Sequence, residues 1–119
     1  MSISPPQWLF IIETDPRSSP RPAEAIRIAA GVAVWKSVIV KVYLREAAIL
    51  ILSGSRERLL DEDNFAQYLP LLWDQPDSIF VERSSPFLLQ AGKVEMQVRA
   101  ISDEQAAELA AGCSHVSRF

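Results

Sequence analysis

Two serines follow a short apolar run in the segment SIFVERSSPFLLQAG, residues 78–92. Ile79 to Val81 is typical of a buried strand, and in an α/β protein a reacting group usually sits where such a strand ends. As nucleophiles, Ser84 and Ser85 lack a G-x-S-x-G elbow, and the chain has only one histidine to act as a base. We therefore expect one of them to cap a helix that begins at Pro86, with contact to a ligand as the second possibility.

Cys113 is the only thiol of the chain, and His115 lies two residues further on. A catalytic interpretation makes Cys113 a sulfur acceptor, with His115 promoting formation of the thiolate. The alternative is a small, half-buried residue that follows the end of a helix. The second interpretation is favoured, because the carboxyl end of a helix disfavours a nearby anion and so opposes activation of the thiol.

A loop rich in turn-forming residues precedes the first expected helix and could bind a small anion. The free N–H groups of that helix could receive a phosphate or sulfate, helped by hydroxyl groups and by Arg17 and Arg21. Solvated loop residues are the competing explanation. The candidate ligand-binding residues of this loop are Thr14, Asp15, Arg17, Ser18 and Ser19. Neither a G-x-G-x-x-G nor a P-loop pattern is present, so we expect no nucleotide cofactor.

Composition excludes several classes of protein. The chain of 119 residues is 49% hydrophobic and 23% charged, which indicates one folded domain over residues 1–119. A net charge of −3 argues against nucleic acid, one cysteine excludes an internal disulfide, and one histidine argues against zinc. Because we find neither a signal peptide nor an apolar run of ~20 residues, we expect a cytoplasmic protein without a membrane span.

Short apolar strands alternate with helices along the chain. The expected strands are Gln7–Glu13, Ser37–Leu44, Ser78–Glu82, Lys93–Ala100 and His115–Phe119. Between the first two, a helix from Pro22 carries a stripe of small residues at Ile26, Ala29, Ala30 and Ala33. Ser102 and Gln105 form a capping-box pattern at the start of the last helix. This order predicts a three-layer α/β/α fold around a mostly parallel sheet of about five strands.

Four other features leave alternatives open. REAAILIL, residues 45–52, is apolar throughout, and a helix there would be buried on more than one side, which in so small a domain suggests a subunit interface. Pro70 should divide the following helical region into two short pieces. The acidic residues 61–63 suit a solvated helix start better than a metal site. The three tryptophans, Trp8, Trp35 and Trp73, are expected in the core or in an interface.

The segment RPAEAIRIAAGVAVWKSVIVKVYLREAAILIL and the ending ISDEQAAELAAGCSHVSRF resemble the DsrE/DsrF/DsrH-like family, which includes the Tus sulfur-relay subunits. The likeness lies in an alanine-rich helix, a strand rich in Val and Ile, an apolar helix and a capped helix before a closing strand. In that family, a cysteine just beyond the third strand carries a persulfide. The matching residues here are Arg83, Ser84 and Ser85, and a serine hydroxyl cannot hold sulfane sulfur.

The resemblance therefore implies a non-catalytic subunit. The leading hypothesis is a DsrE-like binding or regulatory domain that forms a homo-oligomer, or a hetero-oligomer with related subunits, and that accepts a small anionic ligand at the strand ends. A second hypothesis is a sulfur carrier that uses Cys113. A third is a purely structural subunit of a hetero-oligomer, with residues 45–52 at the interface.

Overall fold

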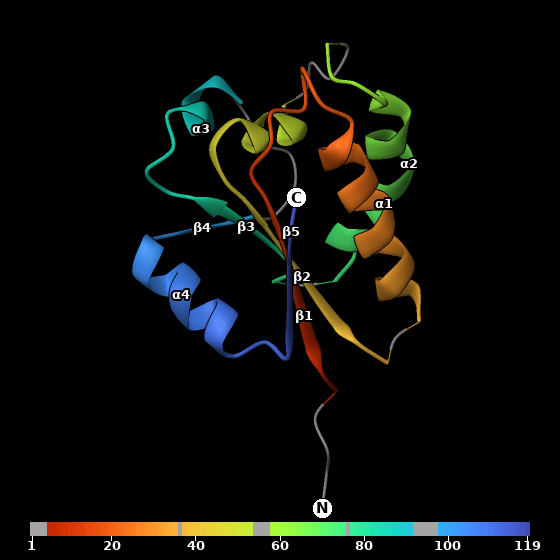
Figure 1. The fold of residues 1–119 in the computed structure, drawn as a ribbon, viewed down its shortest axis with the longest axis vertical. Helices are drawn as coiled ribbons and strands as arrows, with labels where there is room; N and C mark the ends of the chain where they lie inside the picture. Colours follow the sequence, from red (N-terminus) through yellow and green to blue (C-terminus); the bar gives the residue numbers. More distant parts are fainter. Residues whose placement is uncertain (1–4, 36, 54–57, 76, 92–97) are drawn as a thin grey trace, which may run out of the picture.

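The computed structural model describes residues 5–35, 37–53, 58–75, 77–91 and 98–119. Five parallel strands form one sheet in the order β4-β3-β2-β1-β5 (Figure 1). The strands are β1 (Gln7–Ile12), β2 (Ile39–Leu44), β3 (Ile79–Glu82), β4 (Arg99–Ile101) and β5 (His115–Arg118). The helical elements are α1 (Arg21–Val34), the 3₁₀ helix η1 (Glu46–Leu52), α2 (Glu62–Trp73), α3 (Phe87–Gln90) and α4 (Asp103–Ala111). The predicted α/β/α class is thus confirmed.

The larger core lies between the sheet and the pair of helices α1 and α2, which pack side by side in Figure 1. The predicted stripe of α1 is fully inside: Ile26, Ala29 and Ala30 expose none of their surface and Ala33 only 3%. Alanine side chains let the backbone of α1 approach its neighbours closely. The stripe of small residues therefore sets how near this helix lies to the sheet.

The opposite face of the sheet carries α4. Its start is fixed by the predicted capping box, in which Ser102 Oγ accepts from the Gln105 N–H and the Gln105 side chain accepts from the Ser102 N–H. The smaller core under this helix contains Leu9, Tyr43 and Phe80 from three strands. Alternation along each strand sends neighbouring residues to opposite faces, so both cores are built from the same strands.

The apolar segment after β2 forms η1 and lies inside its own chain. Residues 47–52 are all buried, and Ile49 and Ile51 expose none of their surface. The sequence suggested a subunit interface because a segment buried on more than one side would need a partner in so small a domain. That reason does not hold, because the apolar side chains are already buried within their own chain and have little surface left for a partner. The burial on several sides that the composition indicated is supplied by the sheet and α3.

The prediction of two helical pieces around Pro70 is wrong. A single helix, α2, runs from Glu62 to Trp73 with Pro70 inside it. A proline removes one backbone hydrogen bond of a helix and crowds the preceding turn. Here Phe65 and Leu69 before the proline and Leu72 after it are all buried against the core, and this burial holds both turns in line.

The expected strand at residues 93–100 falls largely outside the described residues. Its described end belongs to β4, which occupies an edge of the sheet. Within the described ranges, no helix combines the length and the apolar character that a membrane crossing requires.

Candidate functional site

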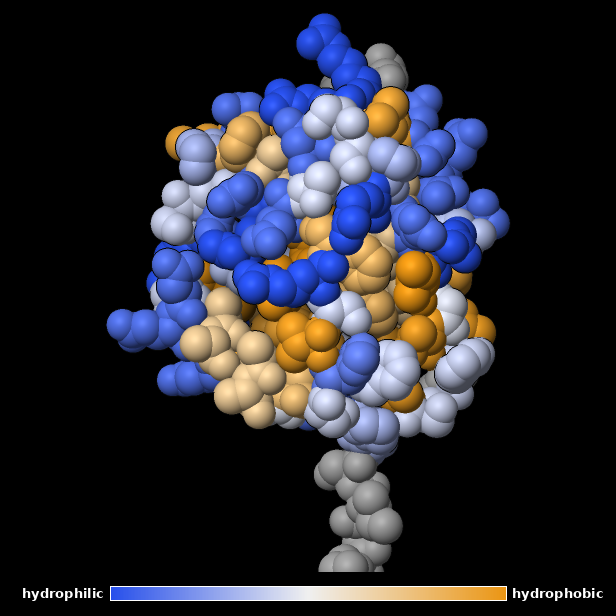
Figure 2. Space-filling view, in the orientation of Figure 1, coloured by the Kyte–Doolittle hydropathy of each residue, from blue (hydrophilic) through white to orange (hydrophobic). Residues whose placement is uncertain are grey.

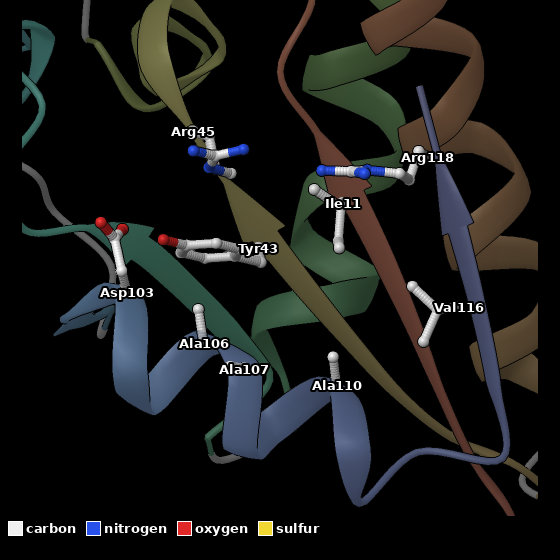
Figure 3. Close-up of a pocket in the computed structure, with 9 residues that line it drawn as sticks. All are labelled: Ile11, Tyr43, Arg45, Asp103, Ala106, Ala107, Ala110, Val116 and Arg118. Atoms are coloured by element: carbon white, nitrogen blue, oxygen red, sulfur yellow. The ribbon is translucent and has the colours of Figure 1, made fainter.

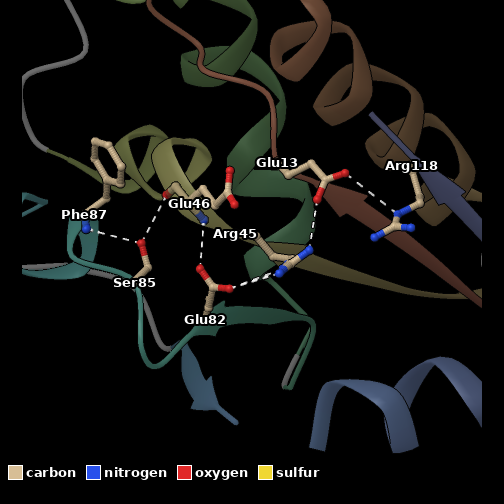
Figure 4. A network of polar contacts seen from close by, with 7 residues as sticks. All are labelled: Glu13, Arg45, Glu46, Glu82, Ser85, Phe87 and Arg118. Atoms are coloured by element: carbon tan, nitrogen blue, oxygen red, sulfur yellow. Dashed lines mark hydrogen bonds and ion pairs between the residues drawn. The ribbon is translucent and has the colours of Figure 1, made fainter. Parts of the chain in front are cut away.

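Charged residues end four neighbouring strands at the carboxyl edge of the sheet. Arg45 Nε and Nη2 donate to Glu82 Oε2 at 3.3 and 3.2 Å, and Nη1 donates to Glu13 Oε2 at 3.0 Å (Figure 4). Arg118 Nε lies 3.9 Å from Glu13 Oε1. The four residues come from β3, β2, β1 and β5, so their charges alternate across the sheet. We call Glu82, Arg45, Glu13 and Arg118 the charge ladder.

Glu82 is the most enclosed member of the charge ladder, with 10% of its side chain exposed. Its second oxygen, Oε1, accepts from the Glu46 N–H at 3.1 Å. Glu46 has a φ of 50°, a left-handed conformation that residues other than glycine rarely adopt. Burial opposes the charge of Arg45, but the attraction and hydrogen bonds of Glu82, with the attraction of Glu13, outweigh it, so the pKa of Arg45 is raised. Because the Glu82 carboxylate accepts from the N–H of Glu46, it holds Glu46 in its left-handed conformation and so fixes the turn from β2 into η1.

The predicted anion-binding loop, residues 14–19, lies at the same edge of the sheet. Arg17 binds the Asp15 carboxylate through Nε and Nη2, at 3.0 and 2.8 Å, and this hydrogen bonding lowers the pKa of Asp15. Ser19 Oγ accepts from the Arg21 N–H at 3.2 Å. The charge of Arg17 is thus already paired within the loop, which weakens its attraction for an added anion.

The start of α3, which follows Ser84 and Ser85 in the chain, lies next to that loop, since the guanidinium of Arg17 is 5.7 Å from the centre of the Phe87 ring. Ser85 is buried, and its Oγ accepts from the Phe87 N–H at 3.2 Å and donates to the Glu46 carbonyl at 3.5 Å (Figure 4). Ser85 therefore holds the start of α3 by this hydrogen bond, although α3 begins at Phe87 and its N-cap position is Pro86, which has no side-chain cap bond, whereas Ser84 is exposed. Contact of either serine with a ligand stays a prediction.

Cys113 and His115 lie at the opposite, amino edge of the sheet, where His115 pairs with Trp8 at the start of β1. The Cys113 side chain packs against the smaller core, and burial raises the pKa of its thiol although Lys41 lowers it. The His115 ring contacts the Trp8 ring at 4.9 Å, and its Nε2 shares a hydrogen bond with Ser117 Oγ at 3.0 Å. No contact joins Cys113 to His115 among the described residues.

A pocket of about 400 Å³ opens between α4 and the sheet (Figure 3). We call it the α4 pocket. Its lining combines apolar side chains with two members of the charge ladder. Strands and strand ends contribute Ile11, Tyr43, Arg45, Val116 and Arg118, and α4 contributes Asp103, Ala106, Ala107 and Ala110.

Tyr43 is the buried polar group of this pocket. It exposes 2% of its surface, and its hydroxyl has no hydrogen-bond partner in the described part of the chain. The three bonded nitrogens of Arg45 donate to Glu82 and Glu13 instead. Leaving a buried hydroxyl without a partner costs about 1–3 kcal/mol. Burial, more than the nearby Glu82 charge, raises the pKa of Tyr43, and Arg45 partly offsets the rise through its charge and its approach to the hydroxyl, although its donors are directed at Glu82 and Glu13.

The raised pKa of Tyr43 predicts a loss of stability at alkaline pH. The tyrosine binds its proton more tightly in the folded chain, so its contribution is complete below the unfolded pKa of about 10 and is lost as the pH rises through the folded value. We expect Tyr43→Phe to lose less free energy of unfolding between about pH 8 and about pH 11 than the wild type, as measured by urea titration. Equal losses in the two proteins would contradict this effect of burial.

The charge ladder and the α4 pocket were not found from the sequence. Glu13, Arg45 and Glu82 each stand at or directly after an apolar run, so a charged residue at the end of three strands was the available signal, whereas Arg118 ends the mostly polar strand HVSR and gave none. Tyr43 gave no signal, because an aromatic residue in a strand is ordinarily core. In the described residues, His, Cys, Asp and Glu side chains form no group of three that could hold a metal ion.

The fold is similar to that in the crystal structure of the ychN protein from E. coli. The match has a TM-score of 0.78 with 14% sequence identity, and it covers 96% of this chain and 99% of that chain. YchN has a DsrE/DsrF-like fold, so the fold that the sequence resemblance implied is confirmed. No family model and no curated protein matches the sequence.

Proposed function

We propose that this chain, which has a DsrE/DsrF-like fold, is a non-catalytic cytoplasmic subunit related to the sulfur-relay proteins, and that it binds and assembles without carrying sulfur. One observation supports this most directly. At the end of β3 the chain has Glu82 bound to Arg45, and just beyond it, where the resemblance expects a persulfide cysteine, Ser85 binds the N–H of Phe87 at the start of α3. Both groups stabilise the fold at the position where a sulfur carrier would react.

The location of the single thiol supports the same proposal. Cys113 lies at the amino edge of the sheet, half-buried, with its pKa raised by burial. Because the thiolate is the nucleophile that accepts sulfur, a raised pKa lowers the reactive fraction at neutral pH. A carrier thiol requires the opposite environment, electropositive and partly exposed.

Sulfur loading tests this proposal. The chain is incubated with inorganic polysulfide and separated from it, and the mass of the intact chain is then measured by mass spectrometry. We expect the wild type to gain no sulfur atom. The matched positive control is the double variant Ser84→Cys with Cys113→Ser, which places an exposed thiol beyond β3 and should gain sulfur. If the wild type gains sulfur and the single variant Cys113→Ser does not, the proposal is wrong and the chain is a sulfur carrier that uses Cys113.

Exposed apolar side chains support self-association. Val34 exposes 58% and Trp35 71% of their surfaces at the end of α1, and Trp73 exposes 36% at the end of α2. Both helices precede neighbouring parallel strands, so their ends lie at the same edge of the sheet. Large aromatic side chains near one another on a surface are typical of interfaces.

Light scattering tests the assembly. We expect the purified wild type to have a mass that is a multiple of the single chain and Trp35→Ser to have a smaller one. Leu89→Ser is the matched control, because Leu89 is 90% exposed but lies in α3 at the opposite edge. A monomeric wild type, or an equal loss of mass in the two variants, would contradict self-association through this surface.

A further inference from the structure

We propose that the α4 pocket binds a small, flat organic acid, with the carboxylate at Arg118 and a hydroxyl group at Tyr43. The inference rests on the proposed binding role and assigns to it a site and a class of ligand. The site lies on the face of the sheet under α4, away from residues 14–19 and 84–85. Figure 3 shows Arg118 and Asp103 at opposite ends of the α4 pocket, with the alanines of α4 between them.

The middle of the α4 pocket suits an apolar, flat body. Ala106 and Ala110 of α4 face Ile11 and Val116 of the strands, and the short alanine side chains leave the space open. A volume of about 400 Å³ falls within the range of pockets that hold small molecules. Figure 2 shows apolar surface on the side of the molecule that carries α4, bordered by strongly hydrophilic side chains.

Arg118 is the cation of the α4 pocket with unused donors. Its side chain is 63% exposed, and its one ion pair within the described residues, with Glu13, is long, with Nε 3.9 Å from Oε1. Arg45, by contrast, donates through three nitrogens to Glu13 and Glu82. A carboxylate of the ligand can therefore accept from the Nη groups of Arg118 in the two-bond geometry that guanidinium groups favour.

Tyr43 provides the second polar contact at the other end. Its hydroxyl is buried and has no partner among the described residues, although the side chain lines the pocket. Because the hydroxyl oxygen is covered, an entering group needs a neighbouring side chain to turn aside. We assign this movement to Asp103, which is exposed in the first turn of α4 and whose charge acts on Tyr43. The Asp103 and Glu82 charges near Tyr43 repel a second anion there. A neutral hydroxyl fits, since it accepts from Tyr43 and donates to Asp103.

Three matched probes test the inference by titration into the isotope-labelled chain, with the amide chemical shifts of Ala106 and Ala110 as the readout. They are para-hydroxyphenylacetate, phenylacetate, which lacks the hydroxyl, and para-ethylphenol, which lacks the carboxylate. We expect the hydroxy acid to bind about threefold to tenfold more tightly than phenylacetate, the factor of one hydrogen bond. In Tyr43→Phe the advantage of the hydroxy acid should shrink, because only its bond to Asp103 remains, and an unchanged advantage would contradict the contact with Tyr43.

Arg118→Gln should weaken both acids about tenfold and leave para-ethylphenol unchanged, because a charge-assisted pair is lost. Arg27→Gln is the matched control, since Arg27 is an exposed arginine that pairs with Glu24 on α1, across the sheet. Acids that leave the Ala106 and Ala110 shifts unmoved, or that bind Arg118→Gln as tightly as the wild type, would overturn the inference. The sulfur-loading and light-scattering results do not depend on this pocket, so the two proposals can fail separately.

Discussion

Arg45→Met is expected to lower the free energy of unfolding by about 2–3 kcal/mol. The substitution leaves Glu82, whose side chain is 10% exposed, without its cation, and leaves Glu13 only the longer contact with Arg118. Breaking a buried ion pair by removing one partner typically costs about 3–5 kcal/mol, and we reduce this value because 28% of the Arg45 side chain is exposed to solvent. Denaturant unfolding of the two proteins at neutral pH measures the difference.

A second substitution separates charge from packing. Glu82→Gln in the Arg45→Met background removes the stranded charge, while the amide oxygen still accepts from the Glu46 N–H, so most of the lost stability should return. Arg27→Met is the matched control, because the Arg27–Glu24 pair on α1 is exposed and should contribute less than about 1 kcal/mol. Equal losses for Arg45→Met and Arg27→Met would mean that the charge ladder does not stabilise the fold.

Leu69→Ala is expected to cost about 3 kcal/mol, within the range of about 2–5 kcal/mol for buried leucine. Leu69 exposes none of its surface and belongs to the larger core, directly before Pro70. The cavity would weaken the packing against the core that keeps α2 one continuous helix across Pro70. Thermal and denaturant unfolding of the variant measure the loss.

The chain supplies its own control for this cavity. Leu71 lies directly after Pro70 in the same helix and exposes 45% of its surface. Leu71→Ala makes the same chemical change where little apolar area is buried, so it should change the free energy of unfolding by less than about 1 kcal/mol. Similar losses at the two positions would contradict the account in which burial holds α2 continuous.

Local signals predicted the elements that depend on near neighbours. The capping box at Ser102 and Gln105 formed as expected, because its hydrogen bonds join residues three positions apart. The stripe of α1 is buried as expected, since helical spacing alone places Ile26 and Ala30 on one side. The alternation of strands and helices then favoured one parallel sheet, and the similarity to YchN agrees with it.

Predictions failed where distant residues compete with local ones. Proline in a helix carries a local cost, and the sequence shows that cost at Pro70 without showing the buried contacts of Leu69 and Leu72 that exceed it. The apolar composition of the segment after β2, residues 45–52, likewise indicated that this segment is buried. Whether its own chain or another copy buries it depends on what α3 and the sheet leave open, which is a property of the whole fold.

The sequence by itself determined the class of fold, the capping box at Ser102 and the lack of a thiol beyond the third strand, because each follows from residue type and short-range geometry. Only the tertiary structure decided which charges meet and where the pocket lies. The order β3-β2-β1-β5 places Glu82, Arg45, Glu13 and Arg118 beside one another although they are far apart in the chain. The packing of α4 likewise encloses Tyr43 without giving its hydroxyl a partner. Contacts between strands that are distant in sequence depend on how the sheet is ordered, and no local pattern of residues encodes that order.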